Sequence, residues 1–209
     1  MRHDELWKHI HAERAALAEA LAGLAADDWD RPSLCTGWTV KDVAAHVISN
    51  PQMGWGFMPG LLARNLGRGY NAMIFREVKR WSGSRTPAVI LAEFETYAAS
   101  TRHVPVTTTV EPLVDVLVHT QDVLRALGMR HDMPPDAAAV AADRVRLSGA
   151  IVGWRRPRVR LVATDFDWAR GRGPTVEGPM QELLMLSTGR APDTSLLSGE
   201  GLELVGPKA

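Results

Sequence analysis

Near the middle of the chain, a stretch rich in apolar residues carries three polar residues that could do chemistry: Asp115, His119 and Asp122. They are four and three residues apart, so on a helix their side chains would lie roughly in line along one face. Asp115 and His119 would then be about 6 Å apart along the axis, close enough for both to reach one cation. The spacing indicates a pair of metal ligands, and it is also typical of a surface ion pair or of a hydrogen-bonded core histidine.

The segment that carries this pair, residues 111–128, has the pattern of one amphipathic helix. Pro112 suits the first turn, where its missing N–H has no intrahelical partner to lose, and Gly128 suits the C-terminal stop. The apolar set that would face the core is Leu113, Val116, Leu117, Val123, Leu124 and Leu127. A pair on one helix still needs another ligand to hold an ion.

A second informative helix is predicted over residues 40–49. Thr39 has the character of an N-cap, and Asp42 three residues later completes an approximate capping box. His46 lies one turn after Asp42, at the border of the apolar side of this helix. A half-buried histidine needs a polar partner, which is a backbone carbonyl, a carboxylate or a metal ion.

The chain has one cysteine, Cys35, just before that helix. A single cysteine excludes an internal disulfide and a cysteine-rich zinc site, so any metal site must use histidine and carboxylate ligands. The sequence offers neither a second cysteine nor an evident histidine partner that would make Cys35 a nucleophile. We therefore expect Cys35 to be buried beside Trp38.

Composition limits the classes of function. The 209 residues are 45% hydrophobic and carry a formal net charge of zero, enough for one domain with an appendage or two small domains. No basic run with interleaved aromatic residues suggests nucleic acid, and no apolar run suggests a membrane span or a secretory signal. We expect a cytoplasmic protein. The sequence has no P-loop, dinucleotide-binding glycine pattern or nucleophile elbow.

The remaining pattern predicts a mainly α fold. Helices are expected at 3–25, 71–81, 87–98 and 137–152, with residues 53–69 as a loop that walls a pocket or packs between helices. The last part of the chain predicts a strand at 158–163, a helix at 178–187 and a strand at 202–205. Residues 1–132 would form a helical bundle, and residues 133–209 a small α/β region packed on it.

Several segments carry a resemblance to a known family. The segments LCTGWTVKDVAAH (34–46), DVLVHTQDV (115–123) and RALG (125–128) resemble the actinobacterial mycothiol-dependent maleylpyruvate isomerases, part of the DinB-like bundle superfamily. Residues 159–165 and 178–190 resemble the tail of the same proteins. The resemblance therefore covers nearly the whole chain.

This resemblance implies a DinB-like four-helix bundle that holds a divalent ion, usually zinc. The implied ligands are His46, Asp115 and His119, with Asp115 where the isomerases commonly have glutamate. Three protein ligands leave a coordination position free, as in catalytic zinc sites, and the same set suits non-heme Fe(II). Gln121 and Asp122 are the nearest candidates to support the ligands or contact substrate, and solvation of the helix explains them equally well.

The resemblance implies a metal-dependent isomerase or thiol transferase. The ion would activate a thiol cofactor, mycothiol, or a water against a small electrophilic substrate. A non-catalytic binding or regulatory protein and a metal-dependent hydrolase remain as alternatives. The substrate-binding arginines of the isomerase cannot be matched individually among Arg155, Arg156, Arg158 and Arg160, and catalytic residues stay unassigned. The sequence does not determine the oligomeric state, and it is compatible with a homodimer.

Overall fold

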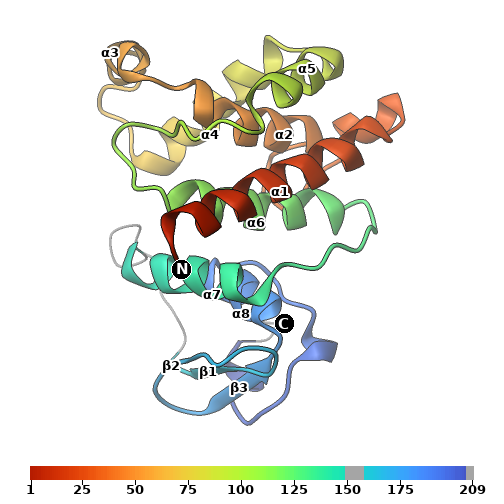
Figure 1. Ribbon diagram of the computed structural model, residues 1–209, viewed down its shortest axis with the longest axis vertical. Helices are drawn as coiled ribbons and strands as arrows, with labels where there is room; N and C mark the ends of the chain where they lie inside the picture. The colour runs from red at the N-terminus through yellow and green to blue at the C-terminus, as the bar shows by residue number, and fades with distance from the viewer. Residues whose placement is uncertain (149–157, 206–209) are drawn as a thin grey trace. The chain divides into compact units, whose positions relative to one another are not determined.

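The structure is a computed structural model that describes residues 1–148 and 158–205 (Figure 1). The chain divides into two compact units. One comprises Trp7–His131, and the other comprises Met1–Leu6 together with Asp132–Ala209.

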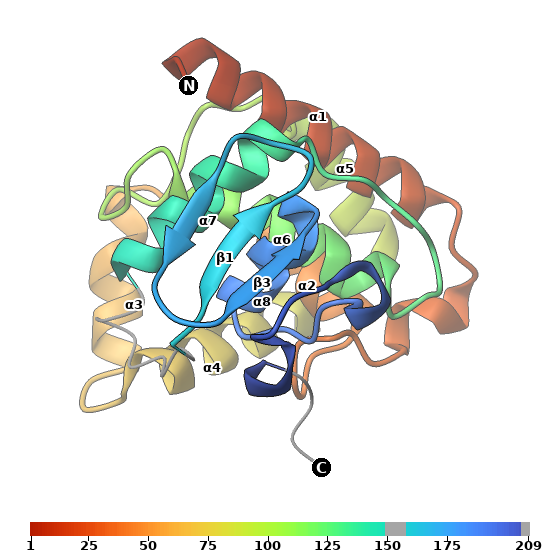
Figure 2. The ribbon, with the colours of Figure 1, turned by 90° about the horizontal axis from the view of Figure 1, so that it is seen from below.

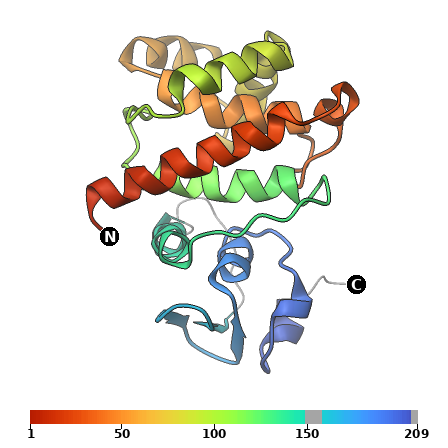
Figure 3. The same ribbon diagram turned by 45° about the vertical axis from the view of Figure 1, so that its right-hand side comes forward.

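The unit formed by Trp7–His131 is a helical bundle. Its helices are α1 (His3–Ala22, which begins in the other unit), α2 (Val40–Ser49), α3 (Met58–Arg64), α4 (Tyr70–Gly83), α5 (Pro87–Tyr97) and α6 (Glu111–Leu124), with short 3₁₀ turns η1 (Ala26–Asp30), η2 (Asn50–Gln52) and η3 (Trp55–Phe57). Helix α2 packs against α4, α5 and α6. In Figures 1 and 3, α5 and α6 lie on opposite sides of α2. The central position of α2 explains why nearly all of its residues are buried.

Helix α2 begins where its capping signal predicts. The Thr39 hydroxyl accepts a hydrogen bond from the Asp42 amide at 3.3 Å, and the Asp42 carboxylate accepts one from the Thr39 amide at 2.9 Å. This reciprocal pair satisfies two N–H groups that the first turn leaves without intrahelical partners. The predicted start and end of the helix at residues 40–49 are confirmed.

Helix α6 also follows its sequence signals. Pro112 lies in the first turn, and Gly128 has a φ of 74°, a left-handed conformation that glycine adopts without steric cost. The regular helix ends at Leu124, and tight turns carry the chain to Gly128. Five of the six residues predicted for the apolar face are buried: Leu113, Val116, Leu117, Val123 and Leu124. The sixth, Leu127, lies beyond the end of the helix and is half-buried.

The second unit contains the small sheet. Its elements after Asp132 are α7 (Pro135–Ser148), β1 (Arg160–Ala163), β2 (Ala169–Gly171), β3 (Thr175–Gly178), α8 (Met180–Ser187), η4 (Thr194–Leu196) and η5 (Leu202–Leu204). The strand order is β2-β1-β3, with β1 antiparallel to β2 and parallel to β3. Helix α8 contacts both β1 and α7, and Figure 2 shows it behind the sheet. The predicted class, mainly α with a small C-terminal α/β region, is confirmed.

Three details differ from the sequence prediction. The segment 53–69 contains η3 and α3 as well as loop, and the glycine-rich stretch after β1 forms β2 and β3. The strand predicted at 202–205 is wrong: Leu204 N and Val205 N bond to carbonyls three residues back, which closes a 3₁₀ turn. Of the helix predicted at 137–152, residues 149–152 lie outside the described residues, as do Arg155 and Arg156. Among the residues described, no helix is both long and apolar enough to cross a membrane.

Candidate metal centre

The packing of α2 against α6 brings together three side chains that are far apart in the sequence. His46 Nε2 lies 2.8 Å from Asp115 Oδ1, and His119 Nε2 lies 3.5 Å from the same oxygen. The two imidazole rings meet edge to face, with centroids 5.0 Å apart and an interplanar angle of 88°. One ligand atom from each residue lies within 4.8 Å of the other two.

This donor set fits a divalent ion. Two imidazole nitrogens and a carboxylate oxygen are ligands of zinc and of non-heme iron, which bind them at about 2.0–2.2 Å. Ligand atoms around such an ion are roughly 3–4 Å apart, a spacing that these three residues reach with small side-chain adjustments. Asp115 is one methylene shorter than glutamate, and its Oδ1 still approaches both imidazoles.

The charges at the cluster keep Asp115 ionised. Burial alone would raise the pKa of this carboxyl, but the facing imidazoles of His46 and His119 outweigh burial and lower the pKa to about 2. Burial alone would lower the pKa of His46, but the negative charge and the hydrogen bond of Asp115 have the larger effect, so the pKa of His46 is raised. Asp115 is therefore in the deprotonated state that a metal ligand requires, with a proton held against His46.

Asn50 fixes the orientation of Asp115. Its Nδ2 donates a hydrogen bond of 2.7 Å to Asp115 Oδ2, which leaves Oδ1 directed at the two imidazoles. Asn50 follows His46 by four residues at the end of α2, so both reach α6 from the same side. Sequence reasoning missed this role, although the i, i+4 spacing from His46 was the available signal.

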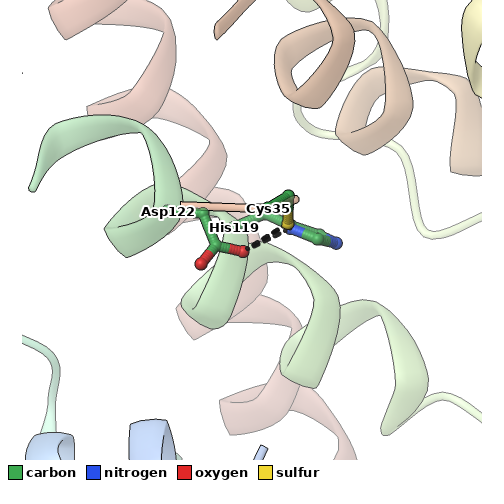
Figure 4. Close-up of side chains that lie close together, drawn as sticks. All are labelled: Cys35, His119 and Asp122. Carbon is green, nitrogen blue, oxygen red and sulfur yellow. Dashed lines mark hydrogen bonds and ion pairs between the residues drawn. The ribbon is translucent and has the colours of Figure 1, made fainter. Parts of the chain in front are cut away.

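Asp122 and Cys35 lie close to Nδ1 of His119, and Figure 4 shows the three side chains together. Asp122 is fully buried, and its Oδ2 lies 2.9 Å from His119 Nδ1. An ionised carboxylate only accepts hydrogen bonds, so with Asp122 ionised Nδ1 would carry a proton and Nε2 would be the nitrogen available to a cation. Asp122 is thus placed to support His119, one of the two roles considered for it.

The thiol of Cys35 joins the same carboxylate. Cys35 Sγ donates to Asp122 Oδ2 at 3.0 Å and lies 3.6 Å from His119 Nδ1. The expectation of a cysteine simply buried beside Trp38 is therefore incomplete, because Cys35 is half-buried and contacts a histidine and an aspartate. The partners are 84 and 87 residues away in the sequence, which explains why no local pattern revealed them.

Trp38 forms an aromatic wall beside both histidines. Its ring is stacked near that of His119, with centroids 5.8 Å apart, and meets that of His46 edge to face at 5.2 Å. Only 9% of Trp38 is exposed, so the indole restricts the imidazoles sterically and shields this side of the cluster from water.

Gln121 does not take the supporting role considered for it. Its Nε2 donates to the His131 carbonyl at 2.7 Å, and its Oε1 accepts from Arg125 Nε at 2.6 Å. These bonds tie α6 to the segment that follows it. Gln121 is buried because it anchors the backbone, and Asp122 is the neighbour that turns to His119.

A helical bundle with two imidazoles and a carboxylate converging between α2 and α6, followed by a small mixed sheet, defines the class of this protein. The family model for the mycothiol maleylpyruvate isomerase N-terminal domain matches residues 10–164, and the chain belongs to this family.

Other proteins share sequence or fold with this chain. Two uncharacterized proteins from different strains of Mycobacterium tuberculosis are each 29% identical over 160 residues, covering 72% of this chain and 80% of theirs. The crystal structure of mycothiol-dependent maleylpyruvate isomerase has a TM-score of 0.66 at 15% identity, and a histidine-to-alanine mutant of that enzyme has a TM-score of 0.67 at 14% identity. Each comparison covers 96% of this chain and 93% of the solved chain, so the fold is shared over almost the whole length.

Proposed function

We propose that this protein is an enzyme that binds a divalent metal ion, most simply zinc, through His46, Asp115 and His119. The ion activates a thiol cofactor, mycothiol in the first instance, or a water, against a small electrophilic substrate. The observation that carries the proposal is the convergence of three ligand atoms from two helices within 4.8 Å.

The residues of the cluster each have a defined part in this proposal. Asp122 holds the Nδ1 proton of His119, so that Nε2 is free to coordinate. Asn50 holds Oδ2 of Asp115, so that Oδ1 faces the ion. A divalent ion held by three protein ligands keeps a position for an exogenous ligand and lowers the pKa of a thiol or water bound there.

The choice of cofactor rests on the family. The chain belongs to the mycothiol maleylpyruvate isomerase family, and the solved enzyme with the same fold is described as mycothiol-dependent. Transfer of that cofactor to this chain implies a reducing compartment such as the cytoplasm, where low-molecular-weight thiols persist. Maleylpyruvate is the first substrate to test, because it is the electrophile named for the solved relative.

Metal analysis tests the site. Protein purified without a metal-affinity tag and loaded with zinc should retain about one equivalent per chain after gel filtration. His46→Ala and His119→Ala should each lose it. The matched control is His103→Ala, a histidine of the same unit that hydrogen-bonds to Val104 and Thr107 and should leave the stoichiometry unchanged. Equal metal content in wild type and both ligand variants would show that the site is assigned wrongly.

Calorimetry with mycothiol tests the cofactor. Zinc-loaded protein should bind the thiol, and turnover of the electrophile should require both zinc and thiol. Turnover without any thiol would instead indicate a metal-dependent hydrolase. Thiol binding without turnover of any electrophile would indicate a binding protein on the same bundle.

A further inference from the structure

The turn that precedes α2 makes two different contacts with His119. Trp38 N donates to the Cys35 carbonyl at 2.9 Å, and Gly37 between them has a φ of 79°, which closes a tight turn of the type that needs glycine at its third position. The turn therefore presents Trp38 to the face of the His119 ring and the Cys35 thiol to its Nδ1 edge.

The same turn is fastened to α6 by backbone as well as by side chains. Leu34 N donates to the Asp122 carbonyl at 3.0 Å, and Ser33 Oγ accepts from Cys35 N at 3.1 Å. Cys35 is thus held in place on both sides of its Cα. Its sulfur meets Asp122 Oδ2 because the backbone brings it there.

Asp122 Oδ2 accepts a hydrogen bond from the Cys35 thiol at 3.0 Å and lies 2.9 Å from His119 Nδ1. Asp122 is fully buried, so loss of either donor would leave this carboxylate oxygen with less compensation for its lost hydration. The side chain would rotate to regain hydrogen bonds, and rotation of Asp122 would release the His119 ring.

We propose that Cys35 is a positioning residue for the metal site, and that covalent modification of its thiol weakens metal binding through Asp122 and His119. The proposal rests on the metal site of the proposed function. Cys35, His119 and Asp122 also form a set that could hold an ion by itself. We assign them to support instead, because an ion there would need the His119 nitrogen whose proton Asp122 accepts.

The class of reagent expected to modify the Cys35 thiol is a low-molecular-weight disulfide. In the exchange, the S–S bond of R–S–S–R breaks, a new S–S bond forms between Cys35 Sγ and one R–S group, and the thiol proton leaves with the other group as R–SH. The Cys35 sulfur is oxidised and one sulfur of the reagent is reduced. The product has no S–H donor for Asp122 and places a bulky group against the His119 ring.

The chain has a single cysteine, so a thiol reagent acts at one position. The probe is oxidised 2-mercaptoethanol, and the readout is the Kd for Co²⁺ from chelator competition, with the visible Co²⁺ spectrum recorded alongside. Modification of the wild type should weaken Co²⁺ binding at least about tenfold, the lower range for loss of an outer partner of a ligand, and dithiothreitol should restore it. Cys35→Ser treated with the same reagent should not change.

Substitutions separate positioning from a general structural role. Cys35→Ala should weaken Co²⁺ binding about tenfold, and Cys35→Ser, which keeps a donor, should remain within about threefold of wild type. Thr36→Ala, an exposed neighbour in the same turn, is the matched control and should have no effect. Circular dichroism should show the same helical content in every variant.

Three results would overturn the inference. In the first, Cys35→Ala and the modified wild type still bind one Co²⁺ with unchanged affinity. This result would reject the positioning role of Cys35 and leave the proposed function intact. A near-ultraviolet thiolate-to-cobalt charge-transfer band lost in Cys35→Ser would make Cys35 a direct ligand. A wild type that binds no Co²⁺ or zinc would overturn the metal site and this inference together.

Discussion

Asp115 and Glu77 are two carboxylates of the helical unit with similarly low pKa values and different surroundings. The pKa of each is lowered to about 2, against the opposing effect of burial. Glu77, on α4, is held by Arg64, Asn65 and Arg80. Asp115, on α6, is held by two imidazoles and Asn50.

The difference shows that a shifted carboxyl pKa does not by itself mark a functional site. The guanidinium groups around Glu77 only donate hydrogen bonds and have no lone pair for a metal. They bind α3 to α4. The imidazoles around Asp115 each have a ring nitrogen that can coordinate a metal when it carries no proton. Only the second cluster can exchange protons for a cation.

The largest expected effect separates the two carboxylates directly. Asp115→Asn should weaken zinc binding by more than about 100-fold, beyond the range expected for partners outside the coordination sphere, because it removes the charged ligand. Glu77→Gln should leave the Kd for zinc within about twofold of wild type. Competition with a chromophoric chelator measures both. Equal losses of zinc affinity in the two variants would mean that Asp115→Asn weakens binding because it unfolds the protein.

A pH dependence of zinc binding is expected at the Asp115 cluster. The pKa of His46 is raised, so the metal-free site holds a proton at pH values below that pKa, and zinc must displace it. The affinity should therefore fall about tenfold for each pH unit below the pKa of His46 and level off above it. Titrations in buffers of different ionisation enthalpy should detect proton release. An affinity independent of pH would contradict the assignment of His46 as a ligand.

The two asparagines provide a matched pair. Asn50 Nδ2 donates to Asp115 at 2.7 Å, and Asn65 Nδ2 donates to Glu77 at 2.8 Å. Asn50→Ala should weaken zinc binding about tenfold because Oδ2 loses its anchor. Asn65→Ala should lower thermal stability and leave the zinc Kd unchanged. A tenfold loss in both would show that the two clusters are coupled.

The smallest effect concerns stability at Glu77. Glu77→Gln should lower the free energy of unfolding by about 1–2 kcal/mol at neutral pH, a figure reduced for the partly exposed arginines. The folded pKa lies below the ordinary 4.5, so this contribution is complete above about pH 4.5 and is lost as the pH falls towards 2. Urea unfolding at pH 7 and at pH 3 should show the difference between wild type and variant shrinking. A constant difference would exclude the ion pairs as its source.

Local signals predicted the elements that carry the site. Thr39 and Asp42 define the start of α2, and the apolar periodicity of residues 111–128 defines α6, because capping and amphipathic spacing act within a few residues. The spacing of Asp115 and His119 is a property of one helix and could be read directly. The pairing with His46 came from the family resemblance, since periodicity says nothing about which helices meet.

Contacts across the fold could not be predicted. Asn50 meets Asp115 across 65 residues, and Cys35 meets Asp122 across 87, and neither pair has a local signature. Helix α3 was missed because its glycine and its aromatic surroundings are typical of loops, and tertiary packing decides its conformation. The strand predicted at 202–205 failed because alternating apolar residues over four positions also fit a 3₁₀ turn.

An anomalous-difference map from a crystal soaked in zinc and measured at the zinc edge tests the central claim most directly. We expect one strong peak per chain, about 2.0–2.2 Å from His46 Nε2, His119 Nε2 and Asp115 Oδ1, with Asp122 still bonded to His119 Nδ1. A peak on the Cys35 side of the ring, or no peak between α2 and α6 in a zinc-saturated crystal, would contradict it.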